Sequence, residues 1–286
     1  MKWKRNTGLD QIEDRRGQGG GGLGGSLGGG GGFPIPIPGG KAGGGIGGLI
    51  ITVVLFLLFS GVLGGGNGVA QPGGTLNPQN DIDGFVAATV ADIQAYWTDE
   101  FARTGKDYPQ TKLVLFDGST SSGCGPASSA TGPFYCPADQ KVYLDLGFFD
   151  ELQTRFGAKG GDLAIAYVIA HEFGHHVQTV TGVSDLVQRE SQQDPSRQNE
   201  LSVRQELQAD CLAGVWVNSS ASDLEAGDIE EALSAASAVG DDRIQESTTG
   251  RIDKEGWTHG SAEQRTQWFT TGYKSGVVGD CDTFAG

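Results

Sequence analysis

Apolar residues recur at steps of three and four along several stretches of this chain. Such spacing places apolar side chains on one face of a helix. The first stretch covers residues 81–101 and carries Phe85, Val86, Val90, Ile93, Trp97 and Phe101. The same pattern predicts helices over residues 162–180 and 197–217, and another from residue 228 onward.

Two short runs have the character of β-strands instead. Residues 113–116 read Leu-Val-Leu-Phe, and residues 142–146 place Asp145 between two leucines. Short apolar or alternating runs of this kind predict strands. Long helices and few strands together predict an α+β domain, mostly helical with a small β-sheet, over residues 81–286.

The first part of the chain has a different composition. Glycine dominates residues 17–48, so residues 1–45 hold few apolar side chains and are predicted to be a disordered Gly-rich tail. Residues 46–63 form an uncharged apolar run, near the shortest length that spans a membrane as a helix. Residues 64–80, rich in Gly, Asn, Gln and Pro, are predicted to be a linker.

The apolar run could serve instead as a core helix or a signal peptide. Glycine-rich flanks argue against a core helix, and the run starts too far from the N-terminus for a typical signal peptide. We therefore expect one uncleaved transmembrane helix. Six Lys or Arg residues precede it and none follows before Arg103, which predicts a cytoplasmic N-terminus and a domain outside the cell membrane.

The charge of the chain limits its partners. Its formal net charge is −15. Nucleic-acid binding needs a basic face for the phosphates, so we expect no nucleic-acid partner. The sequence does not indicate an oligomeric state.

The strongest chemical signal is the pentapeptide His171-Glu172-Phe173-Gly174-His175. It reads H-E-x-x-H inside a predicted helix, where residues four apart lie on the same face. His171 and His175 can therefore bind one zinc ion, with Glu172 as a general base on a water molecule. The alternative is a pair of histidines on an ordinary amphipathic helix.

A third ligand is expected, because catalytic zinc sites usually have three protein ligands and an open position. Glu206 in the predicted helix 197–217 is the candidate, and Asp210 lies four residues later on the same face. Asp210 could orient a histidine ligand. A solvated helix carboxylate is the alternative for Glu206. His176 lies about 100° round the helix from His175, so it is predicted to be structural.

A further segment joins this group. Ser261 and Gln264 form a capping-box pattern, which predicts a helix start with His259 just before it and Arg265 in its first turns. Both side chains could face one pocket and stabilise the oxyanion of a tetrahedral intermediate. The alternative is a surface loop histidine and an exposed arginine.

These residues resemble those of the neutral zinc metallopeptidase family of bacterial membrane-anchored proteins. The resemblance also covers residues 12–17, 132–137, 142–146, 206–216 and 258–269. The E-x-x-A-D element and the H…R spacing are similar to gluzincins that include the CAAX prenyl endopeptidases. The resemblance implies a zincin-like fold with Glu206 as a zinc ligand, and His259 and Arg265 acting on the substrate. It also implies that strand 142–146 lines the cleft and pairs with substrate, the alternative being an interior strand.

Four cysteines follow the apolar run, in the compartment that permits disulfides. They are Cys124, Cys136, Cys211 and Cys281, and no C-x-x-C spacing suggests a metal site. We predict the pairs 124–136 and 211–281. Four cysteines allow three pairings, so the other two stay open.

Together these features predict a Zn²⁺-dependent endopeptidase that hydrolyses peptide bonds in a protein or peptide substrate outside the cytoplasmic membrane. A non-catalytic zinc-containing binding protein, a chaperone or an envelope scaffold is the alternative. Structural zinc sites are normally closed by four protein ligands. Three ligands with an adjacent glutamate therefore favour the enzyme.

Overall fold

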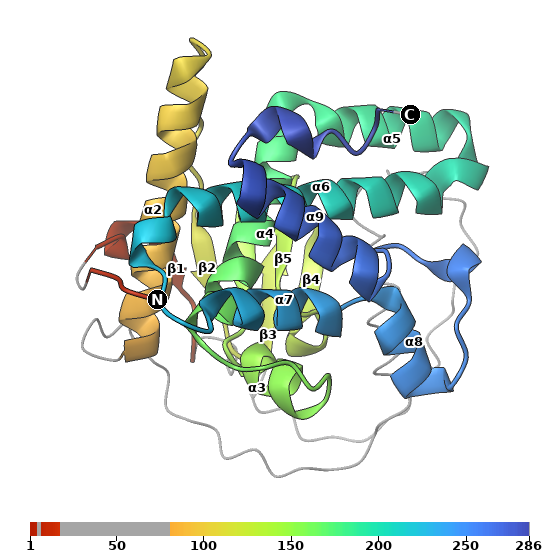
Figure 1. The fold of residues 1–286 in the computed structure, drawn as a ribbon, viewed down its shortest axis with the longest axis horizontal. Coiled ribbons are helices and arrows are strands. Elements are labelled where there is room, and N and C mark those ends of the chain that lie inside the picture. Colours follow the sequence, from red (N-terminus) through yellow and green to blue (C-terminus); the bar gives the residue numbers. More distant parts are fainter. Residues whose placement is uncertain (5–6, 18–80, 286) are drawn as a thin grey trace, which may run out of the picture.

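The structure is a computed structural model and describes residues 1–4, 7–17 and 81–285 (Figure 1). It is an α+β fold, mostly helical, as the sequence predicted. The helices are α2 (Asp81–Arg103), α3 (Gly147–Thr154), α4 (Asp162–Thr181), α5 (Val183–Gln193), α6 (Gln198–Ser219), α7 (Asp228–Ala238), α8 (Asp241–Thr249) and α9 (Ala262–Ser275). Those expected near residues 81, 162, 197, 228 and 262 are confirmed, whereas α3, α5 and α8 were not predicted.

The main sheet has four strands in the order β1-β2-β6-β5. Three strands are parallel, namely β1 (Ile12–Asp14), β2 (Leu113–Leu115) and β6 (Lys141–Leu144). The fourth, β5 (Phe134–Cys136), runs antiparallel to β6 and forms one edge. A separate hairpin joins β3 (Ser119–Ser122) and β4 (Gly125–Ser128). Strands β2 and β6 confirm the two predicted runs.

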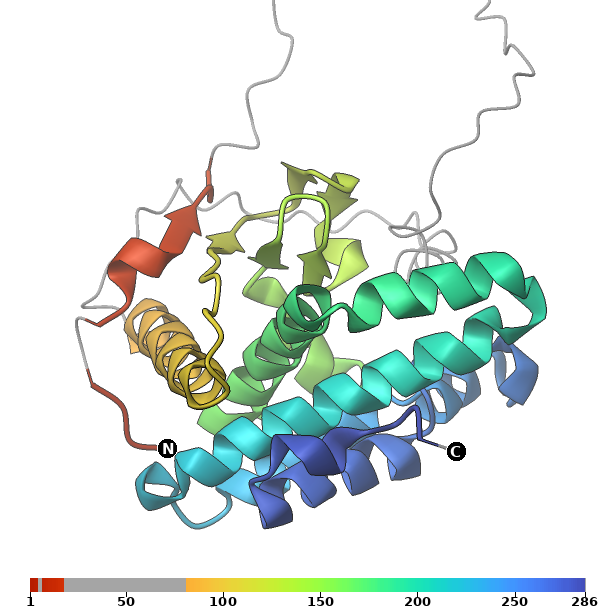
Figure 2. The same cartoon turned by 90° about the horizontal axis from the view of Figure 1, so that it is seen from above.

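Helix α4 runs through the middle of the molecule, with the strands on one side and α6 on the other (Figure 2). Most of its residues are buried, among them Leu163, Ala166, Ile169 and Phe173. Helices α7 and α2 also pack against it. A helix that is apolar on nearly all sides is stable only inside a core. The H-E-x-x-H motif is thus held in the most constrained part of the fold.

Both predicted disulfides are confirmed. Cys124 bonds to Cys136 and Cys211 to Cys281. The first joins the β3–β4 hairpin to β5, and the second joins α6 to the C-terminal segment. The second bond therefore attaches the end of the chain to the helix that carries Glu206.

The predicted disorder of residues 1–45 is wrong for the described part of that range. Residues 12–14 form β1 in parallel with β2, and the short 3-10 helix η1 (Leu9–Gln11) packs on α2. Ile12 is buried in the core. The composition of the whole tail is dominated by glycine, and this average concealed a short segment with its own apolar and charged contacts.

The same strand conflicts with the predicted topology. A single crossing by residues 46–63 would hold residues 1–45 and 81–286 on opposite sides of a membrane. The structure instead pairs residues 12–14 with residues 113–115 in one sheet. The two arrangements exclude each other within one molecule.

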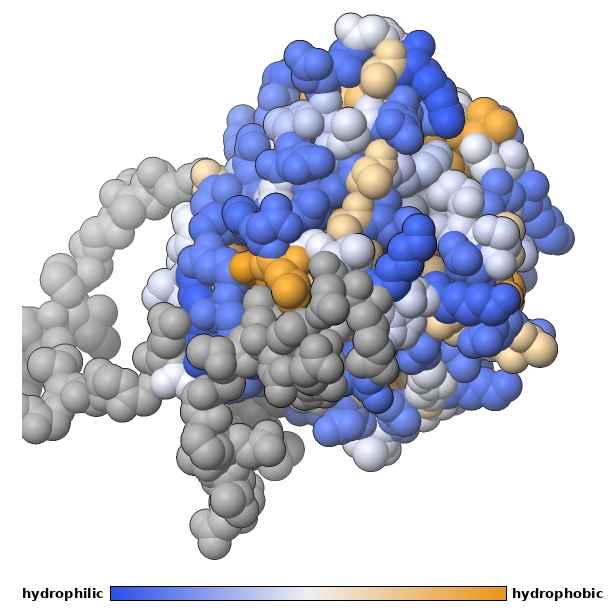
Figure 3. Space-filling model, turned by 90° about the vertical axis from the view of Figure 1, so that its left-hand side faces the viewer, coloured by the Kyte–Doolittle hydropathy of each residue, from blue (hydrophilic) through white to orange (hydrophobic). Residues whose placement is uncertain are grey.

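The predicted span over residues 46–63 and the linker over 64–80 lie outside the described residues. Among the helices of the described part, none combines the length and apolar character needed to cross a membrane. The face at the left of Figure 1 is mainly hydrophilic, and its hydrophobic side chains gather in small groups (Figure 3). On its described residues, this face therefore offers no broad apolar surface.

Candidate metal centre

His171 and His175 lie one turn apart on α4 and face the same way. Both side chains are nearly inaccessible to solvent, and their ring centroids are 4.8 Å apart. Close packing of α4 against α6 at Gly174, which contacts the Ala209 backbone, brings the second helix alongside. The helix geometry and this close approach together set the position of the two imidazoles.

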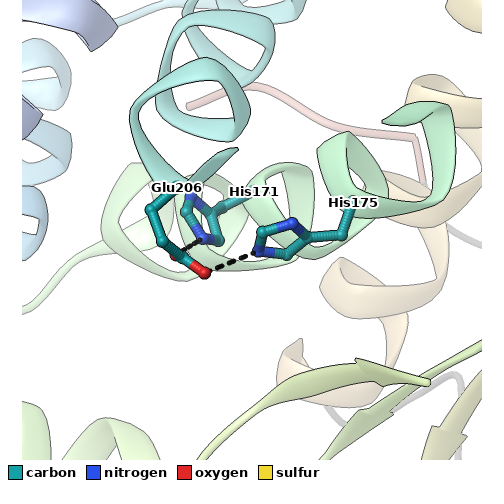
Figure 4. Close-up of side chains that lie close together, drawn as sticks. All are labelled: His171, His175 and Glu206. Carbon is teal, nitrogen blue, oxygen red and sulfur yellow. Dashed lines mark hydrogen bonds and ion pairs between the residues drawn. The ribbon is translucent and has the colours of Figure 1, made fainter. Parts of the chain in front are cut away.

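Glu206 completes the group from α6, as predicted. Its carboxylate lies 3.1 Å from His171 Nε2 and 3.5 Å from His175 Nε2. The three side chains point toward one another (Figure 4). Their ligand atoms all lie within 4.8 Å of one another, which suits a single ion.

The Nδ1 atoms of both imidazole rings, which face away from Glu206, are hydrogen-bonded. His171 Nδ1 lies 2.8 Å from an Asp210 oxygen, and His175 Nδ1 lies 2.9 Å from the Gln178 Oε1. Both partners are acceptors, so each Nδ1 carries the proton and each Nε2 presents a lone pair. Two lone pairs and a carboxylate then face one point, which calls for a cation. Zinc binds this combination of imidazole and carboxylate.

Asp210 is the centre of the network behind the ligands. It is fully buried and accepts a hydrogen bond from the Tyr167 hydroxyl at 2.5 Å. Arg265 also donates to it from Nε and Nη2, at 2.8 and 2.9 Å. Burial alone would raise the pKa of Asp210, but the charges of Arg265 and His171 lower it to about 2. Asp210 is therefore a fixed anion that orients His171, as predicted.

Arg265 lies in the first turns of α9 and lines one pocket together with His259, as expected. Its guanidinium is buried and directed at Asp210, Tyr167 and the Val239 carbonyl. These bonds leave it little freedom to turn toward a substrate oxyanion. In this structure Arg265 holds Asp210 in place, and its contact with a substrate oxyanion stays a prediction.

His259 lies beside Glu206 and is held by Asp241. One Asp241 oxygen lies 3.2 Å from His259 Nδ1. The other accepts the backbone N–H groups of Thr258, His259 and Gly260 at 2.7 to 2.9 Å. Burial alone would lower the pKa of His259, but the Asp241 hydrogen bond and the Glu206 charge raise it. His259 is thus suited to donate a proton toward the metal centre.

Glu172 differs from the other acidic groups of the site. Its side chain is buried, and its Oε2 has no hydrogen-bond partner among the residues that the structure describes. Burial raises the pKa of this carboxyl. A carboxylate with a vacant oxygen and a raised pKa can accept a proton from a nearby water molecule.

Comparison with known proteins agrees with this ligand set. Residues 1–284 match the family described as "Putative neutral zinc metallopeptidase". The chain belongs to this zinc metallopeptidase family. Its cofactor is zinc, and the group His171, His175 and Glu206 is suited to bind it.

Two relatives of this metallopeptidase, from Escherichia coli and Mycobacterium tuberculosis, are similar to it over most of the chain. An Escherichia coli K12 protein called "Uncharacterized protein YpfJ" is 43% identical over 296 residues, which is 99% of each chain. "Uncharacterized protein Rv2575" of Mycobacterium tuberculosis H37Rv is 46% identical over 212 residues, or 70% of each chain. No solved structure matches.

The metal centre of the metallopeptidase opens onto two cavities. A groove of about 860 Å³ reaches His175 and Glu206 between β5 and helices α5 and α6. A smaller pocket of about 100 Å³ shares His175 and Glu206 with the groove and is also lined by Glu172, His259 and Arg265. Both cavities therefore reach the metal ligands.

The strand expected to pair with substrate has no free edge. Strand β6 pairs with β2 on one side and with β5 on the other, so the predicted role of residues 142–146 is wrong and the interior alternative holds. Strand β5 has a free edge and lines the groove together with residues 125–127 of β4. This strand was missed because it has only three residues between two prolines.

His176 is structural, as predicted. Its ring nitrogens lie 3.1 Å from the Tyr135 hydroxyl and 2.6 Å from the Pro109 carbonyl oxygen. Among the residues that position the site, Asp241 and Tyr167 were missed. Tyr167 stands one turn before His171, so helical spacing alone could have suggested it. No spacing links Asp241 to the 258–260 loop, because their contact is tertiary.

Proposed function

We propose that this metallopeptidase is an endopeptidase that hydrolyses peptide bonds with a zinc-activated water molecule. One observation carries the proposal. A buried set of three ligands borders both a groove and a smaller pocket, with the Glu172 carboxylate in the lining of that pocket. A zincin-like mechanism is consistent with this arrangement.

Each residue has a separate task in the reaction. When bound, zinc supplies Lewis-acid polarisation of the water and of the scissile carbonyl. Glu172 takes the proton from the water and passes it to the leaving amine. His259, oriented by Asp241, donates a hydrogen bond to the developing oxyanion. Asp210 and Arg265 keep His171 in the orientation that ligation requires.

The groove suggests how a polypeptide binds. It is bounded by β5, whose outer edge can hydrogen-bond to an extended chain with little demand on sequence. The groove has a volume of about 860 Å³ and includes His175 and Glu206 in its lining. It therefore has room for several residues of a substrate beside the metal centre, which favours cleavage within a chain over removal of terminal residues.

A non-catalytic zinc protein is the second candidate. Such a site would be expected to have a fourth protein ligand. Among the described residues, the cluster that could hold an ion consists of two histidines and one glutamate. Three protein ligands, one fewer than a structural site needs, support the enzyme. An envelope scaffold would also need no groove beside the metal.

We also propose that the domain acts outside the cytoplasm, at the cell membrane. The two disulfides support this location, because such bonds persist in oxidising compartments. The cytoplasmic N-terminus is not part of the proposal, since β1 belongs to the same sheet as the rest of the domain.

The test is digestion of an unfolded protein by the full-length chain, with bound zinc measured in parallel. A truncated chain that starts after residue 80 is unsuitable, because it lacks β1. Chelation should abolish cleavage and added zinc should restore it. Glu206→Gln should lower both zinc content and cleavage. Cleavage that survives full removal of zinc would contradict the proposal.

A further inference from the structure

The small pocket beside the metal has apolar walls. They are formed by Phe148, Phe156, Val168, Val239 and Ile244. Val168 lies on α4 one turn before Glu172, and Ile244 lies on α8. The phenylalanines come from α3 and the segment after it. Three parts of the chain, distant in sequence, thus meet over the zinc helix to form one cavity.

Most polar side chains that line the pocket already have a partner within the metal centre. His171, His175 and Glu206 face the metal, and the guanidinium of Arg265 is bonded to Asp210. Glu172 and Glu206 place carboxylates at the entrance. These charges would repel an acidic ligand. A long polar ligand would lose its hydration without gaining a hydrogen-bond partner.

We propose that this pocket binds an aliphatic side chain of the substrate residue next to the scissile bond. This inference rests on the proposed peptidase function and names the substrate class. A cavity of about 100 Å³ is smaller than the ~150 Å³ cavity that holds benzene, and larger than the ~30 Å³ share of one water molecule. Valine, leucine and isoleucine suit this space, whereas tryptophan does not.

The test is cleavage of a peptide library by the zinc-loaded full-length chain, with one residue beside the cleavage site varied. Leucine should exceed aspartate and glycine in kcat/KM by about ten- to a hundredfold. Val168→Phe fills the pocket and should remove this preference, while Ile244→Ala enlarges it and should favour phenylalanine. Val277→Phe makes the same change at an exposed position and should leave the preference unaltered.

Two results would separate the possible failures. Cleavage with no preference for aliphatic residues, or the same preference in Val168→Phe, would overturn the pocket assignment and leave the peptidase intact. If no peptide is cleaved, the proposed function fails, and the pocket is then tested by binding. Leucine hydroxamate should bind the zinc-loaded chain at least tenfold more tightly than glycine hydroxamate, and equal affinities would overturn the assignment.

A second inference comes from the N-terminal strand. β1 pairs with β2 over three residues, and the Gln94 side chain donates to Gln11 Oε1 at 2.7 Å. Arg16 lies 2.8 Å from Asp14 and 2.9 Å from Asp83, and all three side chains are largely buried. Buried ion pairs of this kind are costly to break.

We infer that residues 7–17 lie on the same side of the membrane as the zinc site. Two of the six basic residues behind the predicted orientation are Arg15 and Arg16. Both are paired with acidic side chains, Arg15 with Glu13 at 2.7 Å. The positive-inside signal is therefore weaker than the count of basic residues suggests.

Glu13 and Lys141 supply a direct test. Their side chains lie 2.7 Å apart, so a carbodiimide should link them by an amide bond. The link should form in native membranes containing the full-length chain, before any detergent is added, and should be absent in Lys141→Arg. Failure to find it in the native chain would contradict the inference.

Labelling provides an independent measurement. Thr7→Cys and Lys274→Cys each add one exposed thiol, and the four native cysteines are bonded in pairs. A membrane-impermeant maleimide added to intact cells should react with both variants or with neither. Reaction with only one of them would overturn the inference.

Discussion

Asp210 contacts more residues of the metal centre than the sequence motifs suggest. It bonds to the zinc ligand His171, to Tyr167 on the same helix as that ligand, and to Arg265 on α9. The sequence predicted its role toward a histidine from spacing alone. It could not show that Arg265 binds the same carboxylate, because that contact joins helices 55 positions apart.

Replacing Asp210 by Asn should weaken zinc binding by about ten- to a hundredfold, because the anion that orients His171 is lost. Competition with a chelator of known affinity measures this change. Asp150→Asn alters an exposed carboxylate in the same way and should leave affinity unchanged. Unchanged zinc affinity in the Asp210 variant would contradict the role assigned to this residue.

The pH dependence of activity should report on His259. Its folded pKa is raised above the ordinary value of 6.5, so the ring keeps its proton to a higher pH than a free histidine and loses it as the pH rises through the raised pKa. The hydrogen bond to Asp241 therefore stabilises the fold below that pKa and ceases to do so above it.

Asp241→Asn removes the negative charge that favours protonated His259. The alkaline limb of the kcat/KM profile should then move to lower pH, and His259→Gln should remove the limb. The profile is measured with zinc saturating at each pH. An alkaline limb at the same pH in both variants and the native chain would show that another group controls it.

At the scale of elements, the crossing of α6 and α9 positions Arg265. Gly214 on α6 faces the Phe269 carbonyl, and Gly272 on α9 faces the Cys211 carbonyl. Neither position has room for a methyl group. Helical periodicity predicted α4 and α6, and the capping box predicted the start of α9. The close crossing was not predicted, because nothing in either helix alone requires contact between these glycines.

Gly272→Ala should force α6 and α9 apart and lower the free energy of unfolding by about 1–3 kcal/mol. Activity should fall with it, because Arg265 would move relative to Asp210. Denaturant unfolding and peptide cleavage measure the two effects. Gly256→Ala is the matched control, since the nearest atom to its added carbon would be 3.6 Å away. Equal stability of the two variants would contradict the close packing.

At the scale of the whole molecule, the sequence predicted the domain and its mostly helical character. It failed where structure depends on distant partners. β1 has three residues, and its stability comes from β2, Gln94 and Asp83, which follow by at least 67 positions. A composition average over a glycine-rich tail cannot detect such a segment. Strand β5 was missed because its three residues, between two prolines, are too few to show a strand pattern.

The central claim is peptide hydrolysis by a zinc site with Glu172 as the base. It is tested most directly by digesting an unfolded protein with the full-length chain and with Glu172→Gln, each shown to hold one zinc per chain. The native chain should produce new carboxyl termini, and the variant should lose activity by several orders of magnitude while keeping its zinc. Equal cleavage by both, or no zinc in the native chain, would contradict the claim.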